Sequence, residues 1–115
     1  MNQHEITERR PLLDASGNLT EPGYAKSLLP VYRRNDIKAN KLRIKEWDYY
    51  LAANDHFAVA LTIADNGYMG LDSISLLHFD EKWERTKSPM RVFPMGRTGL
   101  PETSAAGDTV ITGNG

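Results

Sequence analysis

The chain has 115 residues, of which 40% are hydrophobic and 25% are charged, and it contains no cysteine. This composition is typical of a soluble globular protein. The lack of cysteine excludes disulfides, thiolate catalysis and metal binding through sulfur. The formal net charge of −1 provides no overall field that would attract a polyanion, so we expect no nucleic-acid partner.

The N-terminal sequence MNQHEITERRPLLD mixes charges and lacks the apolar run of a secretory signal, so we expect a cytoplasmic protein. The longest apolar stretch, residues 56–64, is much shorter than the roughly 20 residues of a membrane-spanning helix. We therefore expect no membrane span.

Prolines and glycines interrupt residues 1–38 at short intervals, which predicts a mostly irregular lead-in to a β domain over residues 39–115. From about residue 41 to residue 79, β-branched and aromatic residues dominate, with turn-forming residues at 54–56 and 65–67. This pattern predicts an all-β fold built on an antiparallel meander. In its middle strand, bulky side chains alternate with small ones at a period of two.

The register of the meander follows if both turns are three-residue loops, because that register gathers the bulky side chains on one face. It sets Trp47 opposite Ile63 on this bulky face. The other face is then polar, with small residues along its centre. It carries a cross-strand row of Tyr50, Ala60 and Asp72.

Two further elements are predicted after the meander. Asp80 is a suitable N-cap for a two-turn helix over residues 80–87, which Ser88 and Pro89 would end. Residues 108–112 are predicted to form a last short strand. An Asn-Gly pair follows it, which normally announces a returning strand that this sequence does not contain. We therefore expect residues 39–115 to be an incomplete β domain, truncated from a longer protein.

The chain also resembles a known family through four stretches, which are LLDASGNLTEPGYA, RIKEWDYY, ALTIADNGYMG, and HFDEKWERTKSPM running into FPMGRTGLPETSAAGD. In this order they are similar to the N-terminal portion of a largely bacterial family, domain-of-unknown-function family 2804. Members of that family are considerably longer, so the resemblance also implies an early end. It implies an all-β architecture similar to a lipocalin-like barrel or sandwich, and it transfers no catalytic role to any residue.

The polar face of the meander holds the candidate site residues. Clustered carboxylates beside a phenol can serve as acid and base, which makes Asp48, Asp72 and Tyr50 the candidate catalytic residues. Candidates for ligand binding on the same face are Glu46, Tyr68 and Thr62. The alternative is that all of these are solvated side chains on an exposed sheet face. The three histidines show no ligand spacing, so we expect no metal site, and no cofactor is expected.

Three functional hypotheses follow. The first is a binding module in which a β-barrel or sandwich accepts a hydrophobic small molecule. The second is an enzyme acting on a lipid-like or isoprenoid substrate. The third is a structural or interaction protein that self-associates through an exposed strand edge. A run of cations between residues 33 and 45 could bind phosphate or a nucleic-acid backbone. The preferred interpretation is that Arg43 and Lys45 are the outward-facing neighbours of Leu42 and Ile44 in the first strand, because no base-stacking aromatics interleave with the run.

Overall fold

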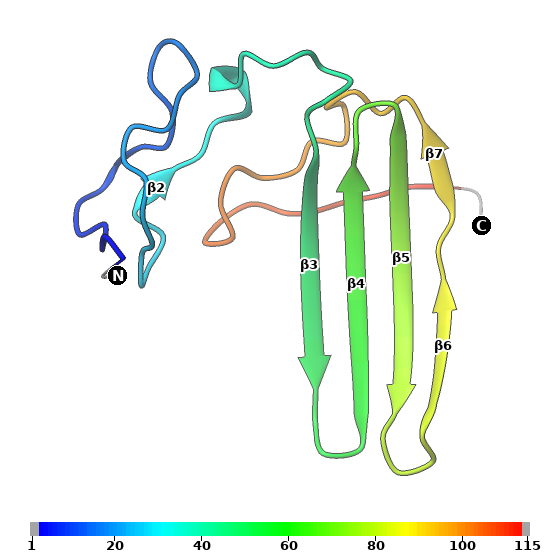
Figure 1. Ribbon diagram of the computed structural model, residues 1–115. Coiled ribbons are helices and arrows are strands. Elements are labelled where there is room, and N and C mark those ends of the chain that lie inside the picture. The colour runs from blue at the N-terminus through cyan, green and yellow to red at the C-terminus, as the bar shows by residue number, and fades with distance from the viewer. Residues whose placement is uncertain (1–2, 114–115) are drawn as a thin grey trace. The chain divides into compact units, whose positions relative to one another are not determined.

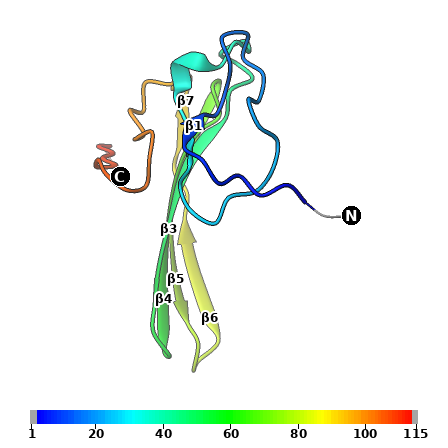
Figure 2. The same ribbon diagram turned by 90° about the vertical axis from the view of Figure 1, so that its left-hand side faces the viewer.

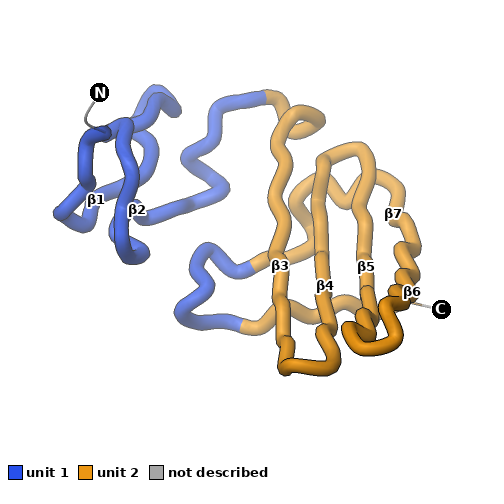
Figure 3. Tube along the Cα trace, turned by 60° about the horizontal axis from the view of Figure 1, so that its bottom comes forward, with its two compact units in different colours: residues 1–39, 101–107 blue, residues 40–100, 108–115 orange. Residues whose placement is uncertain are grey.

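The computed structural model describes residues 3–113, and the chain divides into two compact units (Figure 3). The first unit consists of Met1–Ala39 and Pro101–Gly107, and the second of Asn40–Leu100 and Asp108–Gly115. Each unit has its own backbone pairing, so the two are described separately.

Short backbone pairings shape the first unit. β1 (Arg10–Pro11) pairs in parallel with β2 (Pro30–Val31), and a short 3-10 helix, η1 (Arg34–Asp36), follows. A single parallel bridge joins Glu5 to Tyr24. Proline lacks the N–H that a ladder needs, which keeps these strands short.

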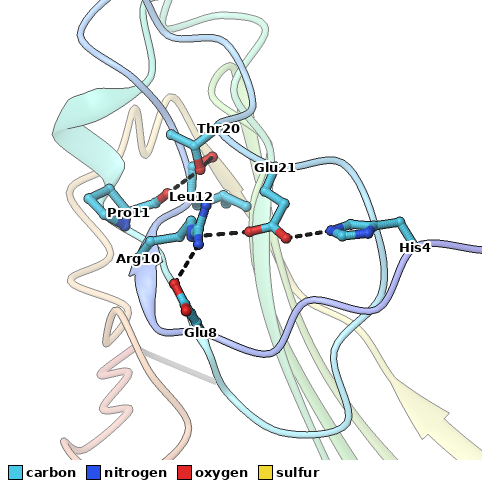
Figure 4. Close-up of polar contacts among 7 residues, drawn as sticks. All are labelled: His4, Glu8, Arg10, Pro11, Leu12, Thr20 and Glu21. Carbon is cyan, nitrogen blue, oxygen red and sulfur yellow. Dashed lines mark hydrogen bonds and ion pairs between the residues drawn. The ribbon is translucent and has the colours of Figure 1, made fainter.

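Polar side chains add to the order of the first unit (Figure 4). Arg10 Nε lies 3.0 Å from Glu21 Oε2, and His4 Nε2 forms an ion pair with the other oxygen of the same carboxylate. Arg10 also donates a hydrogen bond of 2.8 Å to Glu8. The Glu21 carboxylate thus links His4 and Arg10, in a part of the unit where few backbone ladder bonds connect the segments.

A turn over residues 14–18 is closed by the Asp14 carboxylate. Its Oδ1 accepts hydrogen bonds of 2.9 Å from the N–H groups of Ser16 and Asn18. These hydrogen bonds, that from Asn18 foremost, lower the pKa of Asp14 below its ordinary value. Gly17 has a φ of 84°, and a Cβ there would lie 2.8 Å from Lys38 Cγ, so the turn requires glycine.

The second unit is a five-stranded antiparallel sheet, in which β3, β4, β5 and β6 lie in chain order while β7 pairs with β5 in line with β6 (Figure 1). Its strands are β3 (Glu46–Ala53), β4 (Phe57–Asp65), β5 (Met69–His78), β6 (Trp83–Lys87) and β7 (Met90–Val92). The prediction of an all-β fold with an antiparallel meander is confirmed. The meander begins at Glu46, because residues 41–43 form a turn.

The helix predicted over residues 80–87 is wrong. Residues 79–82 form the turn between β5 and β6, where Lys82 takes a φ of 55°, and β6 then continues the sheet. In the sequence WERTK, Trp83, Arg85 and Lys87 occupy alternate positions and point to one face of a strand. The edge of β5 offers backbone hydrogen bonds to this segment, which favours a strand over a helix. The strand predicted over residues 108–112 is also wrong, since no ladder includes those residues.

β6 and β7 keep a single register against β5. Ile74 pairs with Lys87, and Leu71 pairs with Met90, so the two strands continue one line of pairing. Pro89 has no N–H and interrupts the ladder between them. Its carbonyl still accepts a hydrogen bond of 3.0 Å from the Asp72 N–H.

The predicted register is wrong at both hairpins. Beyond the last ladder pairs, the Asn54 N–H donates to Phe57 O and the Asn66 N–H to Met69 O. Each loop therefore has two residues, 55–56 and 67–68, instead of three. In the first loop, Asn54 Oδ1 accepts hydrogen bonds of 2.8 Å from two backbone N–H groups of the turn. The register of this hairpin is therefore set by the hydrogen bonds of Asn54 that close its loop, and not by a preference for placing all bulky side chains on one face.

The shift changes which side chains share a face. Trp47 pairs with Ala64 and Leu61 pairs with Tyr50, so Trp47 and Leu61 lie on opposite faces of the sheet. One face, here called the aromatic face, carries from β3 the side chains of Trp47, Tyr49 and Leu51. The other, here called the aliphatic face, carries from β4 and β5 the side chains of Val59, Leu61, Ile63, Ile74 and Leu76.

The protected core of the second unit is small. Its most buried side chains are Ile44, Ala58 and Ala64, with at most 8% exposure, and the carboxylate residue Asp65, with 0%. None of the three apolar side chains is aromatic. Many of the larger apolar side chains of the sheet are therefore exposed on its two faces.

Candidate functional site

The aliphatic face is ordered into rows that cross the sheet. In one row Tyr50, Leu61, Ile74 and Lys87 lie side by side, one from each of β3, β4, β5 and β6. In antiparallel pairs, directly opposed residues point to the same face. Leu61 and Ile74 are 40% and 47% exposed, so the centre of this row is open to solvent.

The neighbouring row repeats the pattern. It consists of Ala52, Val59, Leu76 and Arg85, again in the order β3 to β6. Leu76 is 43% exposed. In both rows β4 and β5 contribute aliphatic side chains and β6 a cation, while β3 contributes Tyr50 to the first row and Ala52 to the second.

Several hollows lie along this part of the sheet. One, of about 260 Å³, lies beside the β3–β4 turn and is lined by Ala52, Ala53, Asn54, Phe57, Ala58 and Val59. Two others adjoin each other at Ile74. The larger has a volume of about 460 Å³ and is lined by Ile74, Leu76, Arg85, Thr86 and Lys87. The smaller, of about 220 Å³, shares Ile74 with the first. It is also lined by Leu61, Thr62, Ile63, Asp72, Ser73, Pro89 and Ile111.

The cations at the rim keep their charge uncompensated. Arg85 stacks over Trp83, with its Cζ 5.8 Å from the ring centroid. Within residues 3–113, neither Arg85 nor Lys87 has a carboxylate within ion-pair distance. Both are exposed.

Three carboxylates on the same face, those of Asp48, Asp65 and Asp72, each accept hydrogen bonds from a donor. Asp72 forms a two-pronged ion pair with Arg91, in which Oδ2 accepts from Nε and Oδ1 from Nη2, both at 2.7 Å. Arg91 fits there because Gly70, its partner across the strands, has no side chain. A Cβ on Gly70 would lie 3.3 Å from Arg91 Cζ.

Asp65 is the most deeply buried of these carboxylates. Its Oδ1 accepts a hydrogen bond of 2.9 Å from the Gly67 N–H. Its Oδ2 accepts bonds of 2.6 Å from the Gly96 N–H and 2.9 Å from Thr98 Oγ1. One carboxylate therefore fixes both the β4–β5 turn and the loop of residues 94–98, where Met95 takes a φ of 52°.

Asp48 holds the C-terminal residues of the second unit against the sheet. Thr109 Oγ1 lies 2.7 Å from Asp48 Oδ2 and 2.9 Å from the Tyr50 hydroxyl. In the view along the sheet, the red segment that carries Thr109 lies to one side of the strands (Figure 2). Thr109 thus brings Ile111 over the smaller hollow.

The structure brings some of the predicted site residues together and separates others. Asp48 and Asp72 lie in one row with Ile63 between them, and Tyr50 lies in the next row of the same face. The predicted row of Tyr50, Ala60 and Asp72 is therefore wrong, because Leu61, not Ala60, is the partner of Tyr50.

The three residues predicted to bind a ligand are dispersed. Glu46 is on the aliphatic face, opposite Asp65. Tyr68 lies in the β4–β5 turn and is 49% exposed. Thr62 pairs with Tyr49 and belongs to the aromatic face.

Sequence reasoning missed Asp65, Arg85, Lys87 and Arg91. Asp65 had a visible signal, because Asp-Asn-Gly after an apolar run is typical of a turn in which the aspartate accepts backbone hydrogen bonds. Arg85 and Lys87 were hidden by the helix assigned to their segment.

Residues 3–113 contain neither a cluster of metal ligands nor a helix suited to crossing a membrane. That part of the chain holds no group of three or more His, Cys, Asp or Glu residues that could hold a metal ion. It also holds no helix whose length and apolar composition would suit a membrane crossing.

Comparison with known proteins identifies a family but no function. No curated protein and no solved structure matches the chain. A family model described as a domain of unknown function, DUF2804, matches residues 3–115. This match covers nearly the whole sequence and includes every strand of the sheet. The chain therefore belongs to the DUF2804 family.

Proposed function

We propose that the protein is a binding module that holds an apolar small molecule on the aliphatic face of its sheet. The observation that supports this proposal is the pair of hollows that share Ile74, beside side chains of Leu61 and Leu76 that are 40% and 43% exposed. Fully burying one such side chain yields roughly 1.5 to 3 kcal/mol. A ligand that covers several half-exposed ones therefore gains a useful part of that free energy at each.

The aliphatic face is preferred over the aromatic face because of what surrounds it. On the aromatic face, β5 contributes Ser73 and Ser75, whose hydroxyls bond to Ser88 at 2.9 Å and to Thr86 at 2.6 Å. These paired hydroxyls make that part of the sheet polar. The accompanying fold proposal is a lipocalin-like barrel or sandwich with the aliphatic face turned inward.

The experiment is binding of the neutral dye Nile red, followed by its fluorescence. Ile74→Gln places a polar side chain between the two hollows and is expected to weaken dye binding about tenfold or more, because it removes the shared apolar contact. Leu51→Gln is the matched control, since Leu51 is also exposed, at 59%, but lies on the aromatic face. Equal loss in both variants, or no binding by the parent chain, would contradict the proposal.

An enzyme acting on a lipid-like or isoprenoid substrate is the alternative that the sequence suggested. The contacts of its candidate residues support another role. Asp72 is neutralised by Arg91, and Asp48 accepts a hydrogen bond from Thr109. A carboxylate engaged in this way is better suited to holding a segment in place than to moving protons.

A second candidate function, self-association, is favoured by the edge of the sheet. β3 is eight residues long, and among the described residues it makes backbone ladder bonds only to β4. Such an edge is a template for pairing with another strand. The occupant proposed is a second copy of the chain, because antiparallel pairing of β3 with itself gives a closed two-fold dimer.

A further inference from the structure

The rim of the larger hollow suggests what kind of ligand the aliphatic face takes. Resting on the binding function proposed above, we infer that the ligand is a single-chain amphiphile with an anionic head group. Its head is bound by Arg85 and Lys87, and its tail lies along Leu76 and Ile74 toward Leu61.

The two cations of β6 lie directly beside the aliphatic side chains of β5. Arg85 pairs with Leu76 and Lys87 with Ile74, so the charged ends of both rows adjoin aliphatic side chains on the same face. A stem of methylene groups reaches from each backbone to its charge and can lie along that apolar surface. The hollow therefore combines an apolar floor with a positive rim.

The carboxylates of β5 and β6 have other partners than the two rim cations. The nearest carboxylate on the aliphatic face of β5 is Asp72, and Arg91 already neutralises it. Glu84 lies across from Leu77, on the aromatic face, and accepts a hydrogen bond of 2.6 Å from Thr86. Neither acid is placed to satisfy the two rim cations, which leaves them available to an external anion.

The two rows give the site an elongated shape that crosses the strands. Neighbouring strands lie about 4.8 Å apart, so a row that crosses four strands measures roughly 14 Å. The aliphatic part of each row runs from β5 to β4, away from the cations on β6. A head at β6 thus directs the tail across β5 toward β4, and the smaller hollow beneath Ile111 extends this path.

Arginine and lysine side chains select an anionic head group. A guanidinium binds a carboxylate or phosphate through two parallel hydrogen bonds, and a lysine adds a point charge. A neutral head group would leave both cations without a partner. The floor and the rim together therefore fit an amphiphilic anion better than a purely apolar ligand.

The test compares ligands that share a tail and differ in the head. Isothermal titration of the 115-residue chain with decanoate, decanol and decyltrimethylammonium, each as monomers below its micelle concentration, separates the two contributions. Decanoate is expected to bind about tenfold more tightly than decanol, and the cationic ligand the most weakly. Added salt should reduce the preference for decanoate, because it screens exposed charges.

The variants locate the head group. In Arg85→Gln/Lys87→Gln, decanoate binding is expected to fall to the level of decanol, while decanol binding stays within about twofold, because only charge recognition is lost. The matched control is Lys41→Gln/Lys45→Gln, which removes two exposed cations elsewhere in the same unit. It should retain the preference.

Failure of this inference and failure of the proposed binding function would give different binding results. Equal affinities for decanoate and decanol in the parent chain would overturn the inference and leave the proposed binding function standing. No binding of any of the three ligands would overturn the binding function itself. Binding to phosphatidylglycerol vesicles without binding of monomeric decanoate would assign the cations to a lipid surface and overturn the inference in favour of membrane association.

Discussion

Asp72 and Arg91 form an ion pair that joins β5 to β7 on the aliphatic face, through two hydrogen bonds of 2.7 Å each. The two flat groups match in geometry, so each holds the other in one orientation. The pair lies at one end of the aliphatic face. It also explains why a glycine, Gly70, stands opposite the arginine.

This ion pair is expected to stabilise the sheet measurably. The side chains of Asp72 and Arg91 are only 18% and 29% exposed, so Asp72→Asn should lower the free energy of unfolding by about 1 to 2 kcal/mol. Asp80→Asn is the matched control, because the Asp80 and His56 side chains of its pair are 58% and 64% exposed. Urea unfolding measures both, and equal losses would refute the structural importance of the Asp72–Arg91 pair.

Asp65 should matter more than any other carboxylate of the sheet. Asp65→Ala removes the acceptor of three hydrogen bonds and is expected to cost about 2 to 4 kcal/mol, because buried donors are left unpaired. Hydrogen exchange at the Gly96 amide should accelerate in the same variant. Asp55→Ala, in the exposed β3–β4 turn, is the comparison, and an equal effect there would contradict the assigned role.

Self-association through the free edge of β3 can be tested by introducing a charged side chain on that strand. Leu51→Lys introduces a cation on the edge strand and should shift any dimer toward monomer in sedimentation velocity, because charged edges resist strand pairing. Leu76→Lys is the control, since β5 lies inside the sheet and pairs on both sides. If Leu76→Lys dissociates a dimer and Leu51→Lys does not, the interface is the aliphatic face and not the edge.

The turn at residues 14–18 should respond to acid. The folded-state pKa of Asp14 is lowered, so its hydrogen bonds stabilise the turn above the unfolded pKa of about 3.9 and are lost as pH falls through the lower folded value. NMR titration of the Asn18 amide should report this change below pH 3.9, and Asp14→Asn should abolish it. A midpoint at or above the ordinary aspartate value would contradict the role of these hydrogen bonds.

The type and order of the strands in the meander could be predicted from sequence, but their register could not. Residues 57–64 alternate strongly enough to define a strand wherever they pair. Which residue lies opposite depends on how each loop closes, and there Asn54 and Asp65 decide through hydrogen bonds to the turn. The search for one bulky face was misleading because both faces keep large side chains exposed, so burial does not choose between registers.

The candidate site was predictable only in part, for the same reason. Asp48, Asp72 and Tyr50 share a face in either register, since both shifts are odd and the even positions of β3 and β5 stay together. Their neighbours on β4 are exchanged, which replaces Thr62 and Ala60 by Ile63 and Leu61. The face expected to be polar is thereby lined with aliphatic side chains.

The length of the connection between β5 and β6 determines which side chains of β6 lie on the aliphatic face. His78 pairs with Trp83 across residues 79–82, and this spacing points Arg85 and Lys87 to the aliphatic face. One residue more or less in that connection would turn both cations to the reverse side without altering either one. Among homologues, an insertion there would thus exchange a positively charged rim for the hydroxyl and carboxylate of Thr86 and Glu84.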